Sequence, residues 1–336
     1  MNNIPNNPPS ARQPDLSRHT VLVLGAKGRF GQAAVAAFAA AGWQVIAQAR
    51  SAFTQPLPAG VERLIVDALD TRRVIAAVPT AQVIVHALNP DYARWEQLLP
   101  PVTAAVLDIA RATGGLLMVP GNVYNFGAHL PPLLHEDTPF VADTPKAGQR
   151  IAMENSLAAA AEQGVRSVII RAGDFIGGYG TWLDMAITKS VAKGSVTHMG
   201  PDDLTHAWAY LPDLAQVFVR VANQRQHLSG CQRLHYAGIT ATGRQLHAVL
   251  EALAGRPLKA KAMPWHIVKL IALFSPLLRA ALPMRYLWQR PHQLCGTRLE
   301  QLIGPHPAST LSQALAEYVV PQTQLKSTRP SQSRAS

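Results

Sequence analysis

A short apolar run that ends in spaced glycines constrains the fold more than any other part of this sequence. Residues 20–25, TVLVLG, are rich in β-branched apolar side chains, as expected of a buried strand. The next residues, GAKGRFG, place Gly25, Gly28 and Gly31 in a GxxGxxG pattern, and an alanine-rich segment then predicts a helix that ends near Gly42. A strand, a glycine turn and a helix in this order predict a site for the pyrophosphate of a dinucleotide, because bare backbone and a helix N-terminus both favour an anion.

Apolar runs alternate with helical segments up to about residue 175. Further strands are expected within 43–50, 61–70, 81–88, 115–120 and 165–173. Helices are expected over 71–78, over 91–112 with a bend or a split at Pro100–Pro101, and over 146–163. This alternation predicts an α/β fold of the Rossmann type, a doubly wound parallel sheet with helices on both faces.

The alternation loosens after residue 175, which predicts a smaller and mostly helical C-terminal substrate lobe. Helical segments are expected over 181–192, 212–224, 241–254, 264–283 and 309–319, with short strands within 206–211 and 232–237. The predicted organisation is a disordered leader over 1–19, a nucleotide-binding domain over 20–175, a substrate lobe over 176–320 partly interleaved with it, and a disordered tail over 321–336.

The positive charge of the chain is concentrated in one segment. The net charge is +11, but residues 252–299 contain no Asp or Glu and these basic residues: Arg256, Lys259, Lys261, Lys269, Arg279, Arg285, Arg290 and Arg298. A local basic region fits an anionic ligand or partner, or a membrane surface, better than duplex DNA, so no nucleic acid is expected. A solvated basic face is the alternative.

Residues 267–282 are the most apolar stretch, but they are too short to span a bilayer. A helix packed on the lobe is one interpretation, and an amphipathic surface anchor is the other. Two cysteines, Cys231 and Cys295, give neither a disulfide framework nor a metal-ligand spacing. With no apolar signal segment in the leader, a cytoplasmic protein without a metal is expected, either a monomer or a homodimer.

The end of the second strand favours NADP(H) over NAD(H). Sites that prefer NAD usually place Asp or Glu there to bind the ribose 2′-hydroxyl. This strand ends AQARS, with Arg50 at its tip, and the glycine turn adds Lys27 and Arg29. Cations around that ribose suit a 2′-phosphate. Exposed loop cations without a ligand are the competing interpretation.

Several later motifs resemble the extended short-chain dehydrogenase/reductases, the NAD-dependent epimerase/dehydratase family. VDALD resembles the segment after strand three, and VIVHALNP the strand-four motif; GNVYNFG, HEDTP, IIRAGDFIGG and WAYLPDLAQVF follow in the family's order over about 20–225. The resemblance implies an oxidoreductase or epimerase that acts on a small molecule. It implies that the cofactor contacts Gly25, Lys27, Gly28, Arg29, Phe30, Gly31, Arg50, Asp67, Ala68, His86, Ala87, Leu88 and Arg150.

The family's catalytic Ser and its Tyr-x-x-x-Lys pair are absent. Counting back from Tyr124, the serine position falls at Pro120 or Gly121, and neither carries a hydroxyl. The tyrosine and lysine positions hold Lys146 and Arg150.

Three interpretations of this departure remain open. The segment KAGQRIAME also resembles the isoflavone-reductase-like and NmrA-like atypical reductases, which implies that Lys146 transfers the proton; its pKa would have to fall by about 3 units. Alternatively, Tyr124, Asn122 or Asp174 supplies the chemistry. In the third interpretation the protein binds NADP(H) without turnover, as a sensor or scaffold, and Lys146, Arg150 and Glu154 form a solvated ion-pair ladder.

The substrate side is less defined. His198, His206 and Trp208 lie in one segment whose aromatic and imidazole side chains suit the roof of a substrate pocket, although each is also typical of packing. A phosphate-bearing substrate such as a nucleotide sugar would suit the basic 252–299 region.

Overall fold

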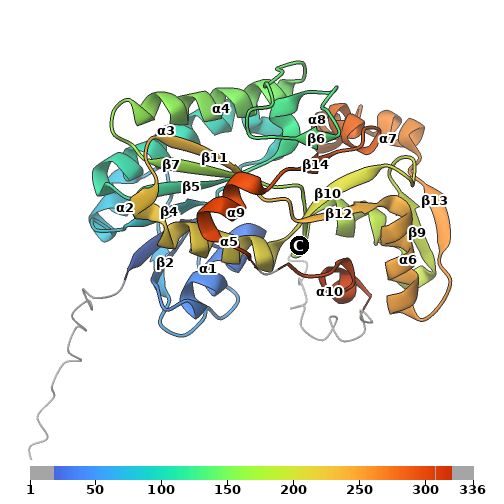
Figure 1. Cartoon of the computed structure of the whole chain (residues 1–336), viewed down its shortest axis with the longest axis horizontal. Helices are drawn as coiled ribbons and strands as arrows, with labels where there is room; N and C mark the ends of the chain where they lie inside the picture. Colours follow the sequence, from blue (N-terminus) through green and yellow to red (C-terminus); the bar gives the residue numbers. More distant parts are fainter. Residues whose placement is uncertain (1–18, 307, 320–336) are drawn as a thin grey trace, which may run out of the picture.

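A seven-stranded parallel sheet lies at the centre of the nucleotide-binding half. The computed structural model describes residues 19–306 and 308–319 (Figure 1). The predicted leader and tail lie outside the described residues, apart from His19. The sheet has the order β3-β2-β1-β4-β5-β7-β11, formed by β1 (Thr20–Leu24), β2 (Gln44–Ala49), β3 (Glu62–Ile65), β4 (Val83–His86), β5 (Leu116–Gly121), β7 (Ser167–Arg171) and β11 (Cys231–His235).

Helices cover both faces of this sheet, because its strands are apolar on both sides. Figure 1 shows α2, α3 and α4 over one face and α1, α5 and α9 over the other. The bounds are α1 Arg29–Ala40, α2 Thr71–Ala77, α3 Trp95–Thr113, α4 Pro145–Ala161, α5 Leu211–Asn223 and α9 Thr297–Ile303. The predicted Rossmann-type fold is confirmed.

The strand order reverses at β1, with β2 and β3 on one side and β4, β5, β7 and β11 on the other. Ligands of doubly wound sheets bind at such a switch point, beyond the carboxyl ends of the strands. The glycine turn follows β1 and His86 ends β4, so both lie at this point.

The second lobe contains more strand than the sequence predicts. A three-stranded sheet has the order β12-β10-β8, and two small pairs are β13-β9 and β14-β6. The bounds are β6 Leu133–Leu134, β8 Asp174–Ile176, β9 Ser195–His198, β10 Thr205–Tyr210, β12 Ile239–Thr242, β13 Lys259–Ala262, β14 Gln293–Leu294, α6 Gly243–Ala254, α7 Trp265–Ile271, α8 Pro276–Ala281 and α10 Leu311–Leu315.

Three predicted helices differ from the observed ones. Helix α3 runs unbroken through Pro100 and Pro101, because its buried face packs on the sheet. The predicted helix over 181–192 is a π-turn at 183–187 followed by a 3₁₀ turn at 191–193. The predicted helix over 264–283 is divided, because Pro276 holds Ser275 in an extended conformation and α8 starts anew. Among the described residues, no helix has the length and apolarity needed to cross a bilayer.

Candidate functional site

The glycine turn after β1 requires glycine at two of its three positions, Gly25 and Gly31, and leaves little room for a side chain at Gly28. Gly25 has a φ of +76°, and a Cβ there would lie 2.8 Å from the carbonyl carbon of Ala87. A Cβ on Gly31 would lie 2.3 Å from the Gly25 oxygen, and one on Gly28 would lie 3.2 Å from it. The turn is therefore closely packed against the end of β4, and it leaves the N-terminus of α1 bare, as a pyrophosphate site needs.

A cleft of about 810 Å³ opens at this switch point. It lies between the carboxyl ends of β1, β4 and β5 on one side and residues 173–185 and α8 on the other. The residues predicted from the sequence that line it are Gly25, Lys27, Gly28, Arg29, Phe30, Arg50, His86, Ala87, Leu88, Asn122, Tyr124, Arg150 and Asp174. The volume suits a dinucleotide with a small molecule beside it.

Two buried polar atoms in the cleft wall fit a polar ligand. His86 Nδ1 and Arg150 Nε have no hydrogen-bond partner among the described residues. Burial and the adjacent Arg150 lower the pKa of His86 to about 3, so its ring is neutral. Arg150 donates through Nη2 to the Pro120 oxygen at 3.0 Å, which directs the guanidinium along the end of β5. With the glycine turn, these groups match the ribose hydroxyls and phosphates of a nicotinamide dinucleotide.

Two of the three predicted cations gather at the end of β2. Lys27 Nζ donates to Ser51 Oγ at 2.8 Å and to the Ala52 oxygen at 3.0 Å, directly beside Arg50. Arg29 instead packs against the loop that follows β8: a Cβ on Gly180 would lie 2.9 Å from its guanidinium. Burial lowers the pKa of Arg29, while Asp184 opposes that shift.

Three predicted cofactor residues lie outside the lining of the cleft. Gly31 is buried within the first turn of α1, where its role is close packing. Asp67 is exposed and accepts a hydrogen bond from the Leu69 amide at 3.0 Å, so its carboxylate stabilises the turn after β3. Ala68 is buried in the core beneath α2.

The helix face that carries Lys146, Arg150 and Glu154 is buried, so the predicted solvated ion-pair ladder is wrong. The three residues are 5%, 8% and 0% exposed. The spacing correctly placed them on one face, but that face of α4 packs toward the sheet and the cleft wall. Each side chain has a separate partner, and the partners come from distant parts of the chain.

The Lys146 amine is held by aromatic groups and does not line the cleft. Nζ donates to the backbone carbonyl oxygen of Tyr92 and lies 4.2 Å from the centroid of the Tyr92 ring and 4.6 Å from that of Trp95. Burial lowers the pKa of Lys146 to about 8, against the attraction of Asp91. Tyr92 and Trp95 themselves line the cleft and separate the amine from it.

Glu154 anchors the turn after β5. Its carboxylate accepts two hydrogen bonds from Arg171 Nη2, at 3.1 and 2.9 Å, and both side chains are buried. Arg171 also donates to the Asn122 oxygen and, at 3.3 Å, to Asn125 Oδ1. This ion pair therefore fixes the backbone that presents Tyr124 to the cleft.

Tyr124 is the tyrosine that this turn directs toward the cleft. Asn122 Oδ1 accepts from the Tyr124 amide at 3.1 Å and sets the turn. Desolvation raises the pKa of Tyr124 well above its ordinary value, and Tyr92 and Asp174 add to the shift. Burial also raises the pKa of Tyr92, in the same aromatic group, to about 12. Both phenols are therefore protonated at neutral pH.

Gly121 is one candidate for the family's serine position, and it has no room for a β-carbon. A Cβ there would lie 2.9 Å from Ile169 Cγ2 and 3.1 Å from Arg171 Cα. Pro120, the other candidate position, lines the cleft without a hydroxyl.

The sequence interpretation missed several lining residues. Tyr92 lies in the short turn before α3 and Trp95 is the first residue of that helix, so this aromatic pair between strand four and the helix was a usable signal. Gln48 is a buried amide on β2 whose Oε1 accepts from the Gly25 amide at 2.9 Å, and only its polarity within an apolar strand marked it. Trp182 and Leu277 belong to the second lobe, and they reach the cleft only because that lobe packs over the carboxyl ends of the strands.

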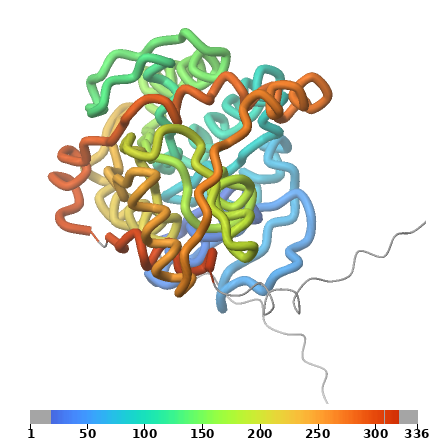
Figure 2. The backbone as a smooth tube through the Cα atoms, turned by 90° about the vertical axis from the view of Figure 1, so that its right-hand side faces the viewer, coloured from blue at the N-terminus to red at the C-terminus, as the bar shows by residue number. Residues whose placement is uncertain are grey.

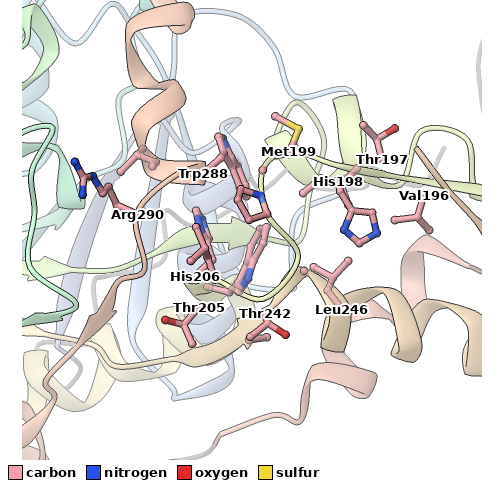
Figure 3. Close-up of a pocket in the computed structure, with 18 residues that line it drawn as sticks. Val196, Thr197, His198, Met199, Thr205, His206, Thr242, Leu246, Trp288 and Arg290 are labelled. Atoms are coloured by element: carbon pink, nitrogen blue, oxygen red, sulfur yellow. The ribbon is translucent and has the colours of Figure 1, made fainter. Parts of the chain in front are cut away.

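His198, His206 and Trp208 line a second, small cavity of about 40 Å³ and not the cleft. Figure 3 shows His206 beside Trp288 at one end of it and His198 at the other. His206 stacks on Trp288 with ring centroids 4.2 Å apart, and its Nε2 lies 2.9 Å from Asp174 Oδ2.

His206 therefore reaches the cleft indirectly, through Asp174. His198 pairs with His247 at 2.9 Å and acts in the packing of the lobe. Within the described residues, no group of three His, Cys, Asp or Glu side chains is arranged to hold a metal ion.

Residues 21–230 match the model of the NAD dependent epimerase/dehydratase family. The chain belongs to this family. Its members are NAD-dependent epimerases and dehydratases, so the resemblance seen in the motifs is confirmed.

One curated relative and two solved structures are similar to this chain. It is 34% identical over 142 residues to a 3-diazoavenalumate denitrifying reductase from a Streptomyces species, a match covering 38% of this chain and 46% of the relative. The chain thus matches about half the length of that protein.

The solved structures share the fold at low identity. A UDP-glucose-4-epimerase from Stenotrophomonas maltophila with bound NAD and formylated UDP-arabinopyranose has a TM-score of 0.72 at 15% identity, covering 93% of this chain and all of that one. A UDP-glucuronic acid 4-epimerase from Bacillus cereus in complex with NAD has a TM-score of 0.71 at 16% identity, covering 91% and 99%.

Proposed function

We propose that this protein is an NADP(H)-dependent reductase that acts on an apolar small molecule carrying a carbonyl or related acceptor group. The observation that carries the proposal is the composition of the cleft. Beside the glycine turn and its polar groups, the lining includes four large aromatic side chains, those of Tyr92, Trp95, Tyr124 and Trp182. The basic 252–299 segment contributes only Leu277, Leu278 and Ala281 to it.

This lining favours an apolar substrate over a nucleotide sugar. A sugar nucleotide carries a diphosphate, and none of the eight cations of the 252–299 segment lines the cleft. The Streptomyces relative is named as a reductase, which supports the same reaction class. The cytoplasmic location expected from the sequence stays a prediction.

The cofactor proposal rests on Lys27 and Arg50. Both line the cleft at the end of β2, where no carboxylate competes for the ribose. The nicotinamide supplies the hydride when bound, while the glycine turn, His86 and Arg150 hold the dinucleotide. Arg50→Asp should weaken NADP⁺ binding tenfold or more and change NAD⁺ binding far less. Calorimetric titration checks this, with the exposed Arg72→Asp as the control; equal affinities of the parent for both nucleotides would contradict it.

Tyr124 is the proposed proton donor, because it lines the cleft and is protonated at neutral pH. Lys146, predicted from the sequence as the proton-transfer group, is the rival. Its amine contacts Tyr92 and Trp95, so we propose that it positions the aromatic group formed by Tyr92, Trp95 and Tyr124.

Two variants separate these roles. Tyr124→Phe should lower kcat for NADPH oxidation about 10²-fold or more without changing NADPH affinity. Lys146→Met should have the smaller effect, and Tyr210→Phe, which lies outside the cleft, should have none. If Lys146→Met instead abolishes turnover and removes a kinetic pKa near 8, the lysine is the donor.

A binding protein without turnover is the second candidate. It is favoured by the absent serine hydroxyl at Pro120 and Gly121 and by the engagement of the Lys146 amine with its own chain. Tight NADPH binding in a parent that oxidises NADPH with no member of a panel of aldehydes, ketones and diazo compounds would establish this role.

A further inference from the structure

Large apolar side chains are exposed together on the two short helices α7 and α8. We name this group the α7–α8 patch; its members are Ile267, Leu270, Ile271, Leu273, Phe274 and Leu277. Phe274 is 85% exposed, and Leu270 and Leu273 are each 62% exposed. Half of the exposed large apolar side chains found in the described residues therefore lie within eleven consecutive positions. Such clustering marks a surface that contacts something apolar.

The patch projects from the molecule. In Figure 2 the α7–α8 segment, in orange, stands out at the upper edge of the view, away from the body of the lobe. The backbone carbonyl groups at the end of α7 have a hydrogen-bond donor: Arg279 donates to the Ala272 oxygen at 3.3 Å and to the Leu273 oxygen at 2.6 Å. The turn between the helices is thus built to hold Leu273 and Phe274 outward.

The segment that carries the patch is positively charged. Lys269 lies within α7, and exposed Lys259 and Lys261 lie on the adjacent β13. The whole segment 252–299 contains no Asp or Glu. Apolar side chains bordered by lysine and arginine complement a surface that is apolar within and anionic outside.

We infer that the α7–α8 patch docks this protein on an anionic membrane surface, with Leu270, Leu273 and Phe274 inserted among the acyl chains. Helices of 7 and 6 residues are too short to cross a bilayer, so the proposed docking is to its surface. The lysines then face the anionic headgroups. A second copy of the chain fits less well, because a self-complementary contact would place these cations against each other.

Docking brings the cleft to the membrane. Leu277 belongs to the patch and also lines the cleft, together with Leu278 and Ala281 of the same helix. Helix α8 packs against the Tyr92–Arg94 turn, which carries the aromatic wall. The substrate class follows if the proposed reductase function holds: an apolar molecule that partitions into the bilayer and reaches the cleft along α8.

The docking test uses the full chain and cosedimentation with vesicles. The vesicles are phosphatidylcholine alone, or phosphatidylcholine with about one-third phosphatidylglycerol. Binding is expected to the anionic vesicles and to weaken at high salt. Leu273→Ser/Phe274→Ser should reduce the partition coefficient tenfold or more. Ile65→Ser/Leu69→Ser, at exposed apolar positions outside this patch, should leave it unchanged.

Two results would overturn the inference: no binding of the parent to anionic vesicles, or equal binding by the Leu273→Ser/Phe274→Ser variant. Loss of a dimer in that variant, with no vesicle binding by the parent, would assign the patch to self-association instead. NADPH binding measured without vesicles is independent of all these outcomes, so failure of docking and failure of the reductase proposal are distinguishable.

Discussion

At the scale of single residues, Glu154 shows how a pattern can be correct in spacing and wrong in environment. The four-residue spacing placed it on one face with Lys146 and Arg150, but spacing does not tell which face is covered. Its partner Arg171 lies on β7, and Lys146 meets Tyr92, which is 54 positions away. Contacts at such separations come from the topology and were not readable from the local pattern.

Glu154→Gln should destabilise the protein by about 3–5 kcal/mol, because it leaves the Arg171 charge buried without its carboxylate. Urea unfolding measures the change. Glu162→Gln, at an exposed position just after the same helix, should shift the free energy by less than about 0.5 kcal/mol. A similar small shift for Glu154→Gln would show that Arg171 finds another counter-charge.

Gly31→Ala should disrupt the glycine turn, because its Cβ would lie 2.3 Å from the Gly25 oxygen. Loss of the thermal stabilisation that NADP⁺ confers on the parent is the expected result. Gly148→Ala is the matched control: no atom lies within 4 Å of its added Cβ, and alanine favours a helix interior by about 0.5–1 kcal/mol. Full NADP⁺ stabilisation of Gly31→Ala would contradict the packing argument.

At the scale of elements, hydrophobic periodicity predicted the strands that are buried on both faces. It missed the short strands that form only by pairing with a distant segment of the chain. Strands β1, β2, β4, β5 and β7 were predicted because a central parallel strand must be apolar throughout. Strands β9 and β13 pair only with each other, and β13 is exposed along its length, so no apolar pattern marked them. The division between α7 and α8 could have been predicted from Pro276, because proline favours an extended conformation in the residue before it.

Helix α6 offers a test of the lobe that is independent of the cleft. Thr242 and Gln245 form a capping box: the hydroxyl accepts from the Gln245 amide at 3.1 Å and Gln245 Oε1 accepts from the Thr242 amide at 2.8 Å. Thr242→Ala should cost about 0.5–2 kcal/mol of unfolding free energy. Thr240→Ala, exposed on the preceding strand, is the control in the same urea titration, and equal losses would show that the cap contributes nothing.

At the scale of the whole molecule, buried histidines make stability depend on pH. Burial lowers the pKa of His86, His235 and His292 to about 3 each. Between pH 6.5 and 3 the unfolded chain binds protons at these sites and the native chain does not, so stability is lost as the pH falls through this range. Each histidine contributes a slope of up to about 1.4 kcal/mol per pH unit.

His235→Gln should flatten this dependence by one such slope, because it removes one of the three buried rings. The Gln amide can still donate to the Leu134 oxygen that His235 Nδ1 contacts at 3.1 Å, so the fold is kept. The measurement is the free energy of unfolding in urea at pH 7 and at pH 5. Exposed His266→Gln should keep the parent's dependence. An unchanged slope in His235→Gln would mean that its ring is protonated in the native state.

Strand β11 has a consequence for how the chain is made. Residues 231–235 pair along the whole outer edge of β7, yet the sequence predicted that the nucleotide-binding domain ends at residue 175. During synthesis, that edge stays open while the ribosome adds the entire segment from 172 to 230, most of which builds the other lobe. A fragment that stops at 175 therefore leaves an apolar strand ready to join other chains. We therefore expect the two halves to fold as one cooperative unit, because β11 completes the central sheet only after much of the second lobe has been made.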